Sequence, residues 1–341
     1  MRTDVALDVR ETSHMSAGML AYVRALRTHL PRVAADLRIA EVGRGDNFDF
    51  AEQVGLPLAL ARLRPRLAHF TTPYVPRIVT VPYVVTVHDL IDLEFPQYAK
   101  RKVAPYWRYV VAPVLRGARA VITDDGATVE LLERYAGVDA TRVAICPLGV
   151  DPPDPLPEPI VRSRPYFFYA GNHRPHKDLP TLVRAWATLF DDWSVDLVLT
   201  GPENPALRAL GGRGERGERG ELIFLGDATE NEVWAYHRGA AAYVHPALRE
   251  GFGLPMLEAL RAGTPVIAAT TAVPAVLTGL VEVFAPGDVP RLADMLARVL
   301  DEPREHNLSD AISRSATAHL TWERTARGTA DIYRSLLDTL R

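Results

Sequence analysis

The sequence predicts an α/β protein made of two doubly wound domains, each with a parallel sheet covered by helices on both faces. Short apolar, β-branched runs alternate with longer helical stretches along nearly the whole chain, which is typical of such sheets. Seven prolines between Pro147 and Pro165 interrupt the alternation, a composition typical of an extended linker, and the pattern then restarts. The length of 341 residues is also about twice that of a common domain.

Composition narrows the class of protein. Hydrophobic residues make up 48% of the chain and the formal net charge is −3, so we expect a globular protein with no general attraction to nucleic acid. The single cysteine, Cys146, excludes an internal disulfide. No apolar run reaches the roughly 18–20 residues that span a bilayer, and the first residues do not resemble a signal peptide. These features predict a cytoplasmic protein.

The elements of the first half follow from apolar periodicity. Strands are predicted at Val5–Val9, Tyr83–Val87, Ala120–Thr123 and Val143–Cys146. Helices are predicted at Met19–Leu30, Lys102–Gly117 and Thr128–Tyr135.

The second half repeats the pattern. Strands are predicted at Tyr166–Tyr169, Val195–Thr200, Leu222–Leu225, Ala242–Val244 and Pro265–Ala268. Helices are predicted at Pro180–Phe190, Glu230–Gly239, Pro255–Ala262 and Val289–Leu300, and the low-complexity stretch Gly211–Glu221 is predicted to be a surface loop. Two such domains form a cleft, and ligands of open α/β sheets bind beyond the carboxyl ends of the strands.

The segment from His245 to Glu258 is the richest in site chemistry. It follows a predicted buried strand and precedes a helix with a proline in its first turn, so the free N–H groups of Phe252, Gly253 and Leu254 are expected to face the strand ends, where they suit an anion or hydroxyls. Glu250 and Glu258 suit hydrogen bonds from sugar hydroxyls. The alternative for Glu258 is a helix-start carboxylate favoured only by the helix dipole.

A second loop of the same kind runs from Gly171 to Pro180. Arg174 and Lys177 lie where a diphosphate would arrive, although a solvated basic loop accounts for them equally well. Gly201, which follows the predicted strand Val195–Thr200, is also a predicted ligand-binding residue. In the first domain His88 ends a predicted buried strand, where it is either a structural or a catalytic histidine. No ligand spacing for zinc occurs, so no metal is expected.

Several motifs, distributed along nearly the whole chain, resemble those of glycosyltransferase family four, the retaining GT-B enzymes. Within that family they resemble most the mannosyltransferase-like subgroup of bacterial polysaccharide synthesis. They are Glu250-x7-Glu258 around Gly-Phe-Gly-Leu-Pro, Gly263–Ile267, Thr86–Ile91, Pro147–Asp151, Leu222–Gly226 and Thr321–Ala326. The resemblance implies a GT-B fold of two Rossmann-like domains facing a central cleft. We expect an acceptor-side domain over 1–155, a nucleotide-sugar domain over 156–322, and a helix over 323–341 that packs back on the first domain.

The resemblance also implies roles for individual residues. Glu258 binds the donor ribose, Glu250 and His88 face the transferred sugar, Lys177 binds the diphosphate, and Gly18 belongs to the first strand–helix loop. Backbone N–H groups at Phe252 and Gly253 hold sugar hydroxyls or the diphosphate. His88, Glu250 and Lys177 are therefore the predicted catalytic residues. Pro175-His176-Lys177 stands where the family has Pro-Arg-Lys, so Arg174 either replaces that arginine or the arginine is lost.

The expected activity is transfer of a hexose, mannose favoured, from a nucleoside diphosphate sugar to an acceptor hydroxyl with retention. GDP-mannose is the favoured donor, a UDP-sugar is the alternative, and neither a cofactor nor a metal is expected. The acceptor is a saccharide or lipid-linked saccharide. The basic, aromatic stretch Tyr98–Tyr109 suits peripheral membrane contact, and the alternative is a solvated helix that packs its aromatic side chains on the domain. The alternatives are a GT-B sugar-nucleotide epimerase and a non-catalytic nucleotide-sugar binding protein.

Overall fold

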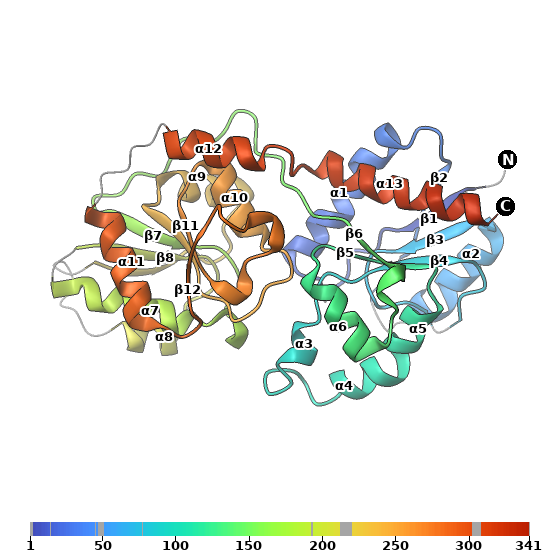
Figure 1. The fold of residues 1–341 in the computed structure, drawn as a ribbon, viewed down its shortest axis with the longest axis horizontal. Helices are drawn as coiled ribbons and strands as arrows, with labels where there is room; N and C mark the ends of the chain where they lie inside the picture. The colour runs from blue at the N-terminus through green and yellow to red at the C-terminus, as the bar shows by residue number, and fades with distance from the viewer. Residues whose placement is uncertain are drawn as a thin grey trace. The chain divides into compact units, whose positions relative to one another are not determined.

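The computed structural model describes two compact units and is shown in Figure 1. Unit 1 comprises Met1–Gly149 and Leu320–Arg341, and unit 2 comprises Val150–His319. The described residues are 3–13, 15–44, 46, 51–76, 78–191, 194–211, 220–301 and 308–340. Most of the predicted loop Gly211–Glu221 lies outside these ranges.

Unit 1 contains a six-stranded, wholly parallel sheet in the order β2-β1-β3-β4-β5-β6. Its strands are β1 (Val5–Asp8), β2 (Ile39–Val42), β3 (Leu67–Phe70), β4 (Tyr83–Thr86), β5 (Ala120–Thr123) and β6 (Val143–Ile145). Every residue of β1, β3 and β5 is buried, as expected for strands covered on both faces. The predictions for β1, β4, β5 and β6 are confirmed to within one residue, whereas β2 and β3 were not predicted.

Helices cover both faces of this sheet (Figure 1). The long helices α1 (Ala17–Val33) and α13 (Trp322–Thr339) pack on each other on one face. The other face holds α2 (Leu56–Leu63), α4 (Val103–Tyr106), a π-helical turn (Trp107–Val111), α5 (Ala112–Gly117) and α6 (Ala127–Ala136), around a core that includes Leu60, Val85 and Leu132. The short helix α3 (Ile91–Glu94) follows β4.

Unit 2 repeats the architecture with the strand order β12-β11-β10-β7-β8-β9, again all parallel. The strands are β7 (Tyr166–Tyr169), β8 (Asp196–Leu199), β9 (Leu222–Phe224), β10 (Ala242–His245), β11 (Val266–Ala269) and β12 (Glu282–Phe284). The helices are α7 (Leu179–Ala187), α8 (Pro205–Leu210), α9 (Glu230–Gly239), α10 (Leu254–Ala262), α11 (Val289–Asp301) and α12 (Leu308–Thr317). The predictions for β7 and α9 coincide with the structure, while β12 and α8 were not predicted.

The strand order of unit 2 reverses direction between β7 and β10. The chain runs outward from β7 through β8 to β9 on one side, and from β10 through β11 to β12 on the other. The loops that leave the carboxyl ends of β7 and β10 therefore diverge at this point, which is where doubly wound sheets bind ligands. Both loops singled out in the sequence, one after Ala170 and one after His245, lie at this position.

A buried hydrogen-bond chain joins α13 to the sheet of unit 1. The His69 Nδ1 atom lies 2.5 Å from the Tyr333 hydroxyl, and its Nε2 atom lies 2.8 Å from Thr86 Oγ1, which in turn contacts the Tyr22 hydroxyl at 3.1 Å. Burial lowers the pKa of His69 to about 3, so the imidazole is neutral and needs both one donor and one acceptor.

Among the described helices, none is long and apolar enough to cross a membrane.

Replacing Tyr333 with Phe is expected to loosen α13, because a ring nitrogen of the fully buried His69 loses its hydrogen-bond partner. An unsatisfied buried polar atom costs about 1–3 kcal/mol. Hydrogen exchange of the α13 amides should become faster in this variant. Tyr98→Phe is the matched control, since the Tyr98 ring is 47% exposed. Equal protection of α13 in both variants would contradict the prediction.

Candidate functional site

The loop after β7 places Lys177 against the sheet. The chain leaves Ala170, makes a 3-10 turn over Pro175–Lys177 and enters α7 at Leu179. Lys177 is only 8% exposed and forms a short ion pair with the Glu250 carboxylate. A solvated basic loop is therefore the wrong description for Lys177, although it fits Arg174, whose side chain is exposed.

The loop after β10 supplies Glu250 and is tied to the first loop. The Leu248 N–H donates to the His176 carbonyl at 2.8 Å, and His245 Nε2 lies 2.9 Å from the same Glu250 oxygen that binds Lys177. Burial favours the neutral acid, but Lys177 and His245 outweigh it and hold the pKa of Glu250 well below its usual range. Glu250 is thus a fixed carboxylate, shared between a lysine and a histidine.

A left-handed glycine turns this loop into α10. Gly253 is the N-cap of the helix with a φ of 77°, in the left-handed region that favours glycine. Within the described ranges, the backbone N–H groups of Phe252, Gly253 and Leu254 donate to no acceptor. Together with the positive end of α10, these N–H groups can receive an anion or hydroxyl oxygens. The Phe252 side chain itself is buried.

Glu258 lies in the body of α10, and its position, its neighbours and its pKa differ from those of Glu250. It is the fifth helical residue and no acidic residue occupies the first turn, so the alternative of a helix-start carboxylate is wrong. The Nε2 atom of His237, a ring that burial keeps neutral, lies 3.9 Å from the Glu258 carboxylate, and the Glu258 side chain is 25% exposed. Burial and the neighbouring Glu230 raise the pKa of Glu258 to about 7. This carboxylate is available to accept hydrogen bonds from a ligand.

The remaining donor-side residue, Gly201, follows β8. Its N–H and carbonyl pair with Gly226, and its φ of 91° lies in the left-handed region. The neighbouring Thr200 carbonyl accepts from His173 Nε2 at 2.7 Å, and the Thr200 hydroxyl binds the Gly171 N–H at 2.9 Å. Gly201 thus borders the loop that carries Lys177.

Of the two site residues predicted in unit 1, His88 lies where it was expected and Gly18 does not. His88 follows β4 as expected, and its Nδ1 atom lies 2.7 Å from Asp124, which follows the adjacent strand β5. Burial opposes the charged imidazolium, but the Asp124 carboxylate outweighs it and raises the pKa of His88. The Nε2 atom of His88 is buried with no partner in the described part of the chain. Gly18, expected in the loop after β1, is instead the second residue of α1.

Sequence reasoning missed His245, His237 and Asp124 as members of these sites. His245 and Asp124 stand at the carboxyl ends of buried strands, and that position was the available signal. In the described ranges, no group of three or more His, Cys, Asp or Glu residues is arranged to hold a metal ion.

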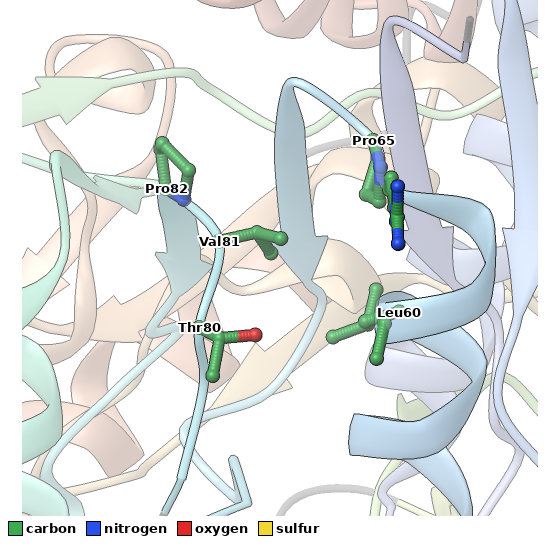
Figure 2. A pocket seen from close by; sticks show the side chains of 7 residues that line it. Leu60, Pro65, Thr80, Val81 and Pro82 are labelled. Carbon is green, nitrogen blue, oxygen red and sulfur yellow. The ribbon is translucent and has the colours of Figure 1, made fainter.

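A separate cavity of about 470 Å³ lies in unit 1 (Figure 2). Pro65 and Pro82 precede β3 and β4, so this cavity sits at the amino ends of those strands, on the opposite edge of the sheet from His88. None of the predicted site residues lines it. Its lining is Leu60, Ala61, Arg64, Pro65, Thr80, Val81 and Pro82.

Two family models together match most of the chain. Residues 155–318 match the family "Glycosyl transferases group 1", and residues 33–154 match "Glycosyltransferase Family 4". A D-inositol 3-phosphate glycosyltransferase of Frankia alni is 38% identical over 284 residues, which cover 75% of this chain and 69% of that protein. The O-antigen chain mannosyltransferase RfbU of Salmonella typhimurium is 24% identical over 183 residues, 54% of this chain and 50% of RfbU, so the match spans half of that relative's length.

The fold is shared with solved structures. Sucrose-phosphate synthase from Thermosynechococcus elongatus superposes with a TM-score of 0.74 at 20% identity, covering 99% of this chain and all of that one (100%). The expected GT-B class, two doubly wound α/β domains, is confirmed.

The environment of Glu258 predicts a pH-dependent stability. Its folded pKa of about 7 lies above that of an exposed glutamate, so folding is favoured by the protonated form, and this stability is lost as pH rises through 7. Glu258→Gln removes the penalty and should raise the free energy of unfolding at pH 8 by on the order of 2 kcal/mol, with little gain near pH 5. Urea unfolding at both pH values measures this. Glu221→Gln, at an exposed site in the same unit, should show no such gain; the same response from both variants would refute the assignment.

Proposed function

Because the chain belongs to the glycosyl transferases group 1 family, with a glycosyltransferase family 4 domain ahead of it, we propose that it transfers a hexose from a nucleoside diphosphate sugar to an acceptor hydroxyl with retention. The observation that carries the proposal is the convergence of Lys177, Glu250 and the α10 N-terminus at the β7/β10 reversal point of unit 2. Mannose is the favoured sugar, since RfbU, one of the relatives, is named a mannosyltransferase. GDP-mannose is accordingly the favoured donor, with a UDP-sugar as the alternative.

The proposed donor site uses each group for a different part of the nucleotide sugar. Lys177 neutralises the diphosphate as a point charge, and the free N–H groups that begin α10 add hydrogen bonds without a further cation. Glu258, which has no cation beside it in the described residues, accepts hydrogen bonds from the ribose hydroxyls. The fixed carboxylate of Glu250 takes the sugar hydroxyls, and the exposed Arg174 is free to approach the phosphates from solvent.

The chemistry follows from where charge develops. Departure of the diphosphate leaves an oxocarbenium-like sugar and adds negative charge to the leaving oxygen. The N–H groups that begin α10 are oriented before the ligand arrives, and the Lys177 ammonium, paired with Glu250 in the free protein, turns to the diphosphate; together they stabilise this charge. We assign His88 to the transferred sugar: Asp124 holds its Nδ1 atom, so the unpartnered Nε2 atom is the one left for a ligand.

The proposal is tested by incubating the protein with GDP-, UDP-, ADP- and TDP-sugars and a saccharide acceptor, with NMR reading the anomeric configuration of donor and product. One donor should be consumed with retention, and nucleoside diphosphate should appear. Glu258→Gln should weaken nucleotide binding by roughly ten- to a hundredfold, the equivalent of one to two hydrogen bonds to a charged group, while Glu221→Gln should not. Interconversion of donor sugars without transfer would indicate the epimerase, and binding without turnover would indicate a binding protein.

We further propose that unit 1 contacts anionic lipid through the segment after α3. Lys100, Arg101, Lys102 and Arg108 are exposed there beside the exposed rings of Tyr98 and Tyr109. Trp107, expected to share this surface, is instead buried in the core. Basic side chains near an anionic bilayer contribute about 1 kcal/mol each, which suits an enzyme whose acceptor is lipid-linked.

Vesicle flotation tests this surface. The protein should float with vesicles containing phosphatidylglycerol at low salt and remain at the bottom with phosphatidylcholine alone. Arg101→Glu with Lys102→Glu should lower the bound fraction at least about tenfold. The double control Arg134→Glu with Arg291→Glu, which changes net charge equally at exposed sites on α6 and α11, should float normally. Equal loss in both double variants would show that net charge, and not this segment, governs binding.

A further inference from the structure

The Glu250 carboxylate is held by two donors at the same oxygen. Lys177 Nζ contacts Oε2, and His245 Nε2 lies 2.9 Å from it. His245 is 1% exposed and stands at the end of β10, whereas Lys177 comes from the neighbouring loop. If a ligand drew Lys177 away, the His245 hydrogen bond to Glu250 would therefore remain.

The hydrogen bonds define the state of His245 in the free protein. An ionised carboxylate accepts only, so the Nε2 atom must carry a proton. Burial lowers the pKa of His245, with Glu250 opposing and Lys177 reinforcing the shift, so the ring is neutral. Its Nδ1 atom then accepts from the Tyr243 hydroxyl at 2.9 Å.

A second complete arrangement is built into the same atoms. The Tyr243 hydroxyl also lies 3.2 Å from the Ala170 carbonyl. If Nδ1 gains a proton, it donates to the Tyr243 oxygen, and the Tyr243 proton turns to the Ala170 carbonyl. The imidazolium then has a partner at each nitrogen, although it is buried, and no polar atom of the chain Ala170–Tyr243–His245–Glu250 is left without one.

Burial is the largest influence on the protonation of His245, and the surrounding charges modify it. The titratable groups facing His245 are Glu250, Lys177 and His176, together with Tyr243 on its own strand and Tyr169 on β7, whose ring lies 6.3 Å away. His176 is neutral at pH 7, since burial and then Lys177 lower its pKa to about 4, and burial raises the pKa values of both tyrosines well above their ordinary value. The ammonium of Lys177 is thus the cation that disfavours a second positive charge.

We propose that binding of a nucleoside diphosphate draws the Lys177 ammonium onto the phosphates and that His245 takes up one proton from solvent, becoming the positioning residue that holds Glu250 in the loaded site. This inference rests on the proposed function, because it needs a diphosphate at Lys177. One proton enters, no covalent bond changes, and Glu250 keeps a cationic partner next to the sugar while Lys177 serves the leaving group. Donor affinity is thereby coupled to proton uptake.

Calorimetry of the intact protein with GDP and with UDP at pH 7, in buffers of different ionisation enthalpy, counts the protons exchanged. His245→Gln is the matched substitution, because the glutamine amide can donate to Glu250 as Nε2 does but cannot be protonated. Protons released by Glu258 or by the nucleotide are common to both proteins, so the difference belongs to position 245. Wild type should take up more protons than His245→Gln, by roughly half a proton or more per nucleotide bound.

A second measurement needs no substitution. Imidazole ¹⁵N spectra of ¹⁵N-histidine-labelled wild type should show a neutral, Nε2-protonated ring without nucleotide and a doubly protonated ring with it. Binding with equal proton exchange in wild type and His245→Gln, or a ring that stays neutral when GDP or UDP is bound, would overturn the inference and leave the proposed function standing. If neither GDP, UDP, ADP nor TDP binds, the proposed function fails and the inference fails with it.

Discussion

The ion pair between Lys177 and Glu250 is the interaction on which the site of unit 2 depends. Each group would be costly to bury alone, by several kcal/mol, so in the free protein each stabilises the other at its buried position. The strand order creates this pairing: β7 and β10 are neighbours, and their loops leave the sheet side by side. The Leu248–His176 hydrogen bond then fixes the two loops together, and α10 begins from this anchored segment.

Unit 1 uses the same constraint with a different pair. In a parallel sheet covered by helices on both faces, the side chains within the strands are buried. Charged side chains therefore lie mainly where the strands end. His88 and Asp124 follow the adjacent strands β4 and β5 and meet at 2.7 Å. His69 is an exception, because it lies within β3, and it is accommodated as a neutral ring bonded to Tyr333 and Thr86. The C-terminal helix is therefore held in unit 1 by a polar contact as well as by packing.

A helix or strand could be predicted from the sequence when its pattern of apolar residues was uninterrupted. Tyr166–Tyr169 and Glu230–Gly239 were predicted with the bounds they have in the structure; the first is buried throughout, and the second begins in the structure with a Thr229–Glu232 capping box. Leu67–Phe70 was missed since His69 interrupts its apolar run, and Ile39–Val42 since it is only partly buried at the sheet edge. For the candidate site, motifs in the sequence were enough to propose Lys177, Glu250 and Glu258. For His245 the sequence offered only its position at the end of a buried strand, because its contacts with Tyr243 and Glu250 are not encoded in any spacing.

The two glutamates of one short segment illustrate how environment assigns different chemistry to the same side chain. Glu250 lies against a lysine and a histidine, so its pKa falls and its charge is permanent. Glu258, eight residues later, faces a neutral His237; burial and the like charge of Glu230 raise its pKa to about 7. Carboxyl groups whose pKa values are driven apart in this way serve different roles in a site. A carboxylate with its cation already present can stay fixed while a ligand changes. One without a cation gains most from hydroxyl donors, and the protein carries that group at a cost to its own stability until such a ligand arrives.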